Sequence, residues 1–289
     1  MDFDFYKIIK IIFILKIAAT LFVLLMYGFG LTTTFSEEFR QFSETWGLFR
    51  NSFGFYHPNQ TGIQIFSICA MLICLRYEVL NIKDYIFILG LCLLNFFFIG
   101  SRTSLFMCII LLVATDLCKR NKGKVFKNKA FKFILTSFPF IMVLILFLQI
   151  FILPKYEIFS FLNLTTSGRL YNNILAYHNI PISFLGSKVI FWDFNLVMDN
   201  DYMYSLIVRG VLPTAIMMAL YSSMLSKLLK SGRFILVVIA VCFLIYGYSE
   251  NISFHIQHNF ALIWLLSDSR IFDFDSDSNT KNEKLIGAA

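Results

Sequence analysis

The sequence has little charge, and its cysteines avoid the polar segments. Only 15% of the 289 residues are charged, whereas soluble domains carry about a quarter, which excludes an ordinary soluble domain. All six cysteines lie inside apolar blocks or at the end of one, so they are interpreted as small hydrophobic residues and predict neither a disulfide framework nor a CxxC metal pair. With 18% aromatic residues, a disordered chain is also excluded.

Long apolar blocks separated by short polar segments fill most of the chain. Crossing a hydrocarbon core about 30 Å thick takes about 20 apolar residues, and continuous rather than alternating blocks argue against a membrane β-barrel. The sequence therefore predicts an all-α, polytopic integral membrane bundle, one domain over residues 1–289. About eight transmembrane helices are expected, at residues 8–31, 62–75, 85–99, 103–117, 133–153, 202–225, 234–249 and 252–266. The first is predicted to be an uncleaved helix, because its apolar run is too long for a signal peptide.

The basic residues predict the orientation of these helices. Seven of them crowd into the short segment 119–132, which the positive-inside rule places in the cytoplasm. By alternation, 18 of the 25 basic residues then fall on the cytoplasmic side, and both termini are expected there. The protein is thus predicted to be a multi-pass protein of the cell membrane, with no nucleic-acid partner.

Two predicted outer segments are long, residues 32–61 and 154–201. Long loops in compact proteins are often functional. The second is expected to carry a short amphipathic helix at residues 170–177. The acidic tail, residues 267–289, is interpreted as a solvated cytoplasmic end.

Four arginines are predicted to lie near the outer face. Arg102 occupies a tight connection between two helices, where a charge is a functional-site hypothesis by default. Arg169 follows Gly168 at a helix start, which favours an anion, while Arg50 precedes His57 and Arg209 lies just inside the sixth span. The alternative interpretation is that arginine side chains reach lipid headgroups and that the histidine has no role.

Glu250 is the carboxylate of the turn between the last two predicted spans. Within the eighth span, His255 and His258 are expected to share one helical face and to bond neighbouring helices. No Cys, Asp or Glu accompanies them in the sequence, so no metal site is predicted. Pro58 is expected to begin a helix capped by Asn59 or Thr61.

Four cations at one mouth of the bundle would repel each other unless they share an anion. A guanidinium matches phosphate oxygens in bidentate fashion. Because the bundle opens to lipid, a lipid-linked phosphate or diphosphate is the ligand that these residues favour.

The motifs Gly54-Phe55-Tyr56-His57-Pro58-Asn59, Gly100-Ser101-Arg102-Thr103, Ser167-Gly168-Arg169 and Asp199-Asn200-Asp201-Tyr202 occur in this order over residues 46–260. In this the chain resembles the Wzy-type polysaccharide polymerases of the O-antigen ligase and polymerase superfamily, which act in capsule and exopolysaccharide assembly. Members usually carry several spans ahead of the first motif, whereas one precedes it here.

The resemblance implies an inverting, metal-independent glycosyltransferase without a cofactor. Its substrates would be repeat units linked to undecaprenyl diphosphate, with the lipid bilayer and flippase and chain-length regulator proteins as partners. Carried onto this chain, Arg102 and Arg169 would bind the diphosphate, Arg50 would assist, and His57 would contact the phosphate or the acceptor. We assign Glu250 as the base that activates the acceptor hydroxyl, and Arg209 to the diphosphate-binding group.

A transporter or flippase for a lipid-linked glycan would use the same arginines without chemistry, and a non-catalytic membrane component is a third alternative. A transporter should show polar groups at mid-membrane and broken helices.

Overall fold

The computed structural model describes residues 5–32, 52–55, 57–121, 123–166, 168–189, 191–194, 196–255 and 257–266. Within these ranges it is all-helical. The main helices are α1 (Phe5–Gly28), α3 (Pro58–Arg76), α4 (Ile82–Leu94), α5 (Arg102–Arg120), α6 (Lys129–Phe151), α7 (Ile158–Thr165), α8 (Arg169–Asn179), α9 (Asp201–Tyr204), α10 (Val211–Lys230) and α11 (Phe234–Tyr246). Two π-helical turns, η4 (Asn95–Ile99) and η8 (Ser205–Arg209), extend α4 and α9, and a 3₁₀ helix, η9 (Phe260–Leu266), follows α11.

Five helical segments of the described chain are long and apolar enough to cross a membrane: Phe5–Gly28, Pro58–Val79, Ile82–Ile99, Lys129–Lys155 and Val211–Lys230. Each coincides with a predicted span. Helix α5 also coincides with one, but it carries Arg102 at its start and Asp116, Lys119 and Arg120 near its end. Helix α11 is wholly apolar and has only 13 residues.

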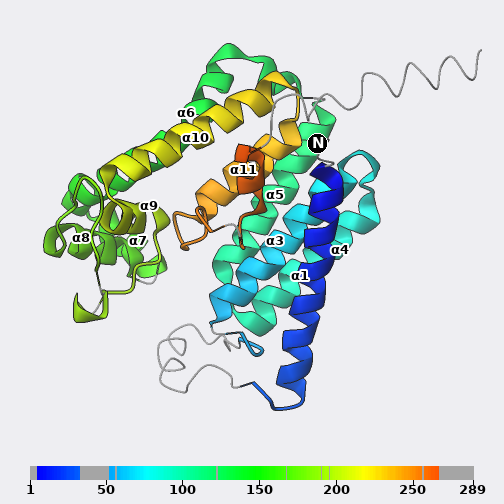
Figure 1. Cartoon of the computed structure of the whole chain (residues 1–289), viewed down its shortest axis with the longest axis horizontal. Coiled ribbons are helices and arrows are strands. Elements are labelled where there is room, and N and C mark those ends of the chain that lie inside the picture. The colour runs from blue at the N-terminus through cyan, green and yellow to red at the C-terminus, as the bar shows by residue number, and fades with distance from the viewer. Residues whose placement is uncertain are drawn as a thin grey trace, which may run out of the picture.

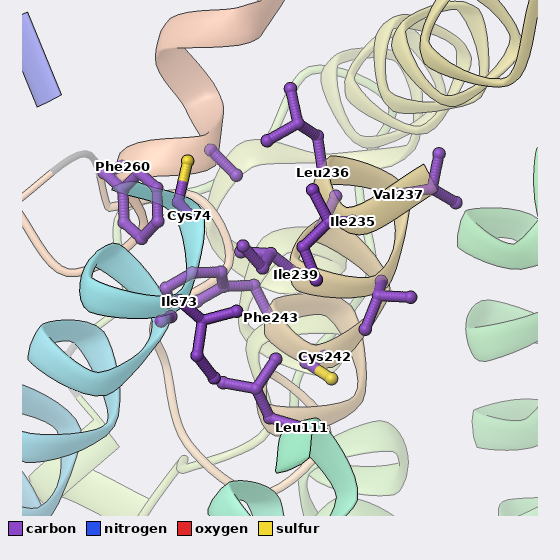
Figure 2. Close-up of a cluster of buried hydrophobic side chains, with 14 of the residues drawn as sticks. Ile73, Cys74, Leu111, Ile235, Leu236, Val237, Ile239, Cys242, Phe243 and Phe260 are labelled. Carbon is purple, nitrogen blue, oxygen red and sulfur yellow. The ribbon is translucent and has the colours of Figure 1, made fainter. Parts of the chain in front are cut away.

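The helices pack around two hydrophobic cores. In the first, α5 lies against α3, α4 and α11, and α1 covers α3 (Figure 1). Figure 2 shows Ile73 of α3, Leu111 of α5 and Phe243 of α11 meeting there. The second core joins α6 to α10 and to the segment that holds α8 and α9. The two helix groups meet along α11, which contacts both α6 and α10.

The predicted helix at 252–266 is wrong, because residues 251–254 form turns and, among the described residues of this stretch, only η9 is helical. Its sequence explains the difference, since polar side chains that compete for backbone groups recur along it. His255 and His258 therefore do not share a helical face. His255 bonds the Asn251 side chain at 3.1 Å, and His258 bonds the neighbouring Gln257 side chain at 3.1 Å.

This non-helical segment nevertheless runs the length of the first core. It begins beside Glu250, which contacts the start of α3. Midway, the Lys16 ammonium of α1 donates to the Gln257 carbonyl at 2.7 Å. It leads into η9, whose Trp264 ring lies 5.6 Å from the Phe5 ring at the start of α1. Non-helical backbone at such depth is stable only when protein groups satisfy it.

The predicted span at 202–225 is interrupted at Gly210. Its φ of 94° is a conformation that favours glycine, and the helical hydrogen-bond ladder breaks there. The Val211 and Leu212 N–H groups donate instead to the Ser183 and Phe184 carbonyls, at 3.1 and 3.0 Å. The long loop is thereby fixed to the base of α10.

A close contact between α3 and α5 generates the first prediction. The Ser104 hydroxyl donates to the Gly62 carbonyl at 2.7 Å, and a Cβ on Gly62 would lie 2.4 Å from Ser101 Oγ and 2.8 Å from Ser101 Cβ. Gly62→Ala should therefore lower stability by about 1–3 kcal/mol through overpacking. In the control, Gly90→Ala, the added Cβ has no atom within 4 Å. This variant should therefore be slightly more stable than the wild type through helix propensity.

Thermal unfolding of both variants in detergent measures these shifts. Midpoints that move in the same direction would contradict the close approach of the two helices.

Candidate functional site

The candidate site is a group of side chains around Glu250, at the end of the bundle where α3 and α5 begin. The Glu250 carboxylate is 6% exposed. Its Oε1 accepts from the Arg169 guanidinium at 2.7 Å and from the Asn59 amide at 2.6 Å. These contacts join α8 and α3 to the turn after α11, three segments far apart in the sequence.

Arg169 connects Glu250 to the Asp199 motif. Its Nε donates to Asp199 Oδ2 at 2.9 Å, and its Nη1 lies 3.5 Å from the Thr103 hydroxyl at the start of α5. Burial lowers the pKa of Arg169, but the Glu250 and Asp199 carboxylates raise the pKa by more, so the net direction is upward. The guanidinium is therefore a fixed cation between two carboxylates.

The residues around Arg169 form the predicted short helix. Helix α8 matches the expected 170–177 closely, with Leu170, Asn173 and Ala176 on its buried face. Gly168 has a φ of 80°, and a Cβ there would meet nothing within 4 Å. Glycine thus serves the left-handed turn before α8.

His57 is the residue that caps α3. Pro58 begins the helix as predicted, but the cap is His57, whose Nδ1 accepts from the Asn59 N–H at 3.1 Å. The expected caps have other partners, because the Asn59 side chain donates to Glu250 and the Thr61 hydroxyl donates to the Ser52 carbonyl at 2.9 Å. A ring nitrogen that accepts carries no proton, so the neutral ring of His57 has its proton on Nε2.

Two of the predicted arginines, Arg169 and Arg209, contact different partners. Arg102 is exposed at the first residue of α5, beside Thr103. Arg209 bonds Ser205 Oγ at 2.5 Å and stacks on the Phe254 ring at 4.9 Å, so its recorded contacts lie outside the Arg169 group. Arg50 lies outside the described residues. The counter-ion of Arg169 is supplied by the protein itself, which removes the argument that this arginine needs an external anion.

The motif Asp199-Asn200-Asp201 fixes this arrangement from three consecutive side chains. Asp199 pairs with Arg169, and the Asn200 amide donates to the Tyr248 carbonyl at 2.9 Å. Asp201 is fully buried and accepts from the Phe254 N–H at 3.2 Å. The motif therefore ties α8, the end of α11 and the non-helical segment together.

The sequence interpretation quoted Thr103, Asp199 and Asp201 inside motifs but assigned them no role, and it assigned Asn59 only a capping role. Their contacts depend on partners distant in sequence. The importance of Lys16, in contrast, can be predicted from the sequence, because a lysine within an apolar span is expected to have a functional or structural role.

Comparisons with known proteins found no family model, no curated protein and no solved structure that matches this chain.

Asp201 generates a prediction on pH. Burial raises its pKa from 3.8 to about 7, against opposing effects of Arg209 and of hydrogen bonds from residues 253 and 254. Because the folded state holds this proton more tightly than the unfolded state, the contribution to stability is present below about pH 4 and is lost as the pH rises to about 7. The decline should reach about 4 kcal/mol at most.

Asp201→Asn should remove this decline and leave the variant more stable than the wild type above pH 7. Unfolding midpoints in detergent between pH 4 and 8 measure it, and Asp193→Asn, at an exposed position, is the control. Equal pH dependence in wild type and Asp201→Asn would contradict a buried, protonated carboxyl.

Proposed function

We propose that this chain is an integral-membrane glycosyltransferase of the outer face of the bacterial cytoplasmic membrane. It polymerises oligosaccharide repeat units linked to undecaprenyl diphosphate. One observation carries the proposal. Side chains from all four motifs of the resemblance, His57-Asn59, Thr103, Arg169 and Asp199, meet around the Glu250 carboxylate. Motifs that share no neighbourhood in sequence share one in space.

In the proposed reaction, Glu250 takes the proton of the acceptor hydroxyl. The hydroxyl oxygen forms a bond to the anomeric carbon of the donor while the bond from that carbon to the diphosphate oxygen breaks. Attack from the opposite side inverts the anomeric centre, and the proton passes from Glu250 to water. Because the diphosphate is a good leaving group, the base is needed only late in the reaction, and an ion-paired carboxylate suffices.

Arg102 is the proposed contact for the leaving diphosphate. It is exposed, it adjoins Thr103 of the site, and it opens α5, where the helix N-terminus also favours an anion. Arg169 has a different role from the one first assigned to it, since its guanidinium already holds Glu250 and Asp199. We assign it as the positioning residue for the base.

His57 suits phosphate contact better than base catalysis. With Nδ1 accepting from the Asn59 N–H, the neutral tautomer of His57 carries its proton on Nε2, and an imidazole N–H is a donor of the kind that phosphate oxygens accept from. This tautomer supports a phosphate contact for His57 and the role of base for Glu250.

A transporter or flippase for the same lipid is the second candidate function. It is favoured by the break at Gly210 and by the non-helical segment beside Lys16, which are features of transporters. The carboxylate and arginine cluster at one end of the bundle favours the enzyme, because transport needs no base.

Purified protein incubated with a lipid-linked repeat unit separates the two. We expect a ladder of glycan lengths from the wild type, and a strong loss of it in Arg102→Lys, which keeps the charge but loses the guanidinium fork. Arg76→Lys, at the other end of α3, is the matched control and should polymerise normally. Passage of the lipid across proteoliposomes without a ladder would establish the transporter in place of the polymerase.

A further prediction separates base from phosphate contact. Glu250→Gln keeps the shape of the side chain but removes the base, so it should reduce the polymerisation rate by about 100-fold or more and donor affinity far less. His57→Ala should weaken donor binding as well. Ordinary turnover in Glu250→Gln would remove Glu250 from the mechanism.

The proposed orientation is tested by reporters. The basic segment 119–132 should be cytoplasmic and the Arg169 loop external. A reporter fused after Lys124 should therefore be active inside the cell, and one fused near Arg169 outside it. The reverse at either position would place the site in the wrong compartment for an exported glycan.

A further inference from the structure

Three cysteines from three helices converge inside the first core. Cys69 lies on α3, Cys92 on α4 and Cys108 on α5, and each is fully buried. Their sulfur atoms all lie within 4.8 Å of one another. The sequence interpretation treated them as small hydrophobic residues and expected no metal, because their spacing in the chain shows no metal motif.

Packing alone does not account for this convergence. A buried cysteine usually acts as a small hydrophobic residue and needs no other thiol beside it. Cys74 and Cys242 illustrate that ordinary case, since both are buried in the same core outside the thiol group. Figure 2 shows them among aliphatic and aromatic side chains.

The spacing of the three sulfur atoms suits a single metal ion. Thiolates bind Zn(II) at about 2.3 Å, which puts three sulfur atoms around one ion about 4 Å apart. Thiolate ligands select soft cations with filled d shells, Zn(II) or Cu(I), over Mg(II) and Ca(II). Each cysteine that binds the ion releases its thiol proton to water as the sulfur–metal bond forms.

Charge favours the divalent ion of the two. Three thiolates leave a net charge of −1 around Zn(II) and −2 around Cu(I), and buried charge is costly without partners. Asn95 lies three residues after Cys92, on the same helical face, and is fully buried. Neither the Nδ2 nor the Oδ1 atom of its amide has a hydrogen-bond partner in the described part of the chain. The Asn95 amide N–H can therefore supply a hydrogen bond to a thiolate, one helical turn from Cys92.

We propose that Cys69, Cys92 and Cys108 form a binding site for a thiophilic divalent d¹⁰ cation, Zn(II), which clamps α3, α4 and α5 together. The site is separate from the Glu250 cluster and does not rest on the proposed function. Helices α3 and α5 also carry Asn59 and Thr103, so the ion would stabilise the two helices that carry these groups.

The test uses the full chain in detergent, reduced and freed of metal. Separate samples are titrated with Zn(II), with Cu(I) and with Cd(II), which serves as an absorbing probe. We expect one Zn(II) per chain, a thiolate-to-Cd(II) charge-transfer band and a raised unfolding midpoint. Cys69→Ser and Cys108→Ser should each weaken binding at least 10-fold. Cys74→Ser and Cys242→Ser, the controls, should bind as the wild type does.

X-ray absorption of the wild type with Zn(II) needs no variant and should show three sulfur neighbours at about 2.3 Å. A shell of only oxygen or nitrogen, no stoichiometric binding, or full binding in both Cys69→Ser and Cys108→Ser would overturn the site. Binding of Cu(I) without Zn(II) would overturn the choice of a divalent ion.

Discussion

The ion pair between Arg169 and Glu250 is the contact on which the arrangement of the site depends. It joins a short helix of the long loop to the turn after α11, and the Asn59 amide adds α3 to the same carboxylate oxygen. A carboxylate buried this deeply would be costly without a partner. Loss of the Arg169 guanidinium would remove the ion-pair partner of both Glu250 and Asp199, so the loop, α3 and the turn after α11 hold their places together.

The second constraint is the non-helical segment after Glu250. Side chains from other helices, together with Asn259 of the segment itself, satisfy its carbonyl groups. The Ser67 hydroxyl donates to the His258 carbonyl, Lys16 donates to the Gln257 carbonyl, and both Tyr221 and the Asn259 amide donate to the Ser253 carbonyl. Helix formation would have satisfied these groups locally. The chain instead uses partners from α1, α3 and α10, which fixes the segment in the core and sets the position of Glu250 at its start.

The sequence predicted those features of the fold that depend on residues close together in the chain. Hydropathy located the long helices, Pro58 located the start of α3, and amphipathic spacing located α8. The His57 cap, the break at Gly210 and the non-helical stretches 252–255 and 257–259 were missed, because each is decided by a competing hydrogen bond. At the break after Gly210, the competing hydrogen bonds run from the Val211 and Leu212 N–H groups to the Ser183 and Phe184 carbonyls, which are distant in the sequence. The motifs gave the site's residue types but not its pairings, since a sequence does not show which carboxylate each arginine meets.

The pairing changes the chemistry that the arginines can supply. A guanidinium held by two carboxylates contributes little net positive charge to a diphosphate, because its field is largely neutralised at close range. In the proposed function the diphosphate is therefore bound by a cation other than Arg169, and Arg102 is both exposed and adjacent to Arg169 through Thr103. The same ion pair fixes the orientation of the Glu250 carboxylate. In the proposed reaction, one arginine positions the base while another stabilises the leaving group, and the two tasks do not compete for the same charge.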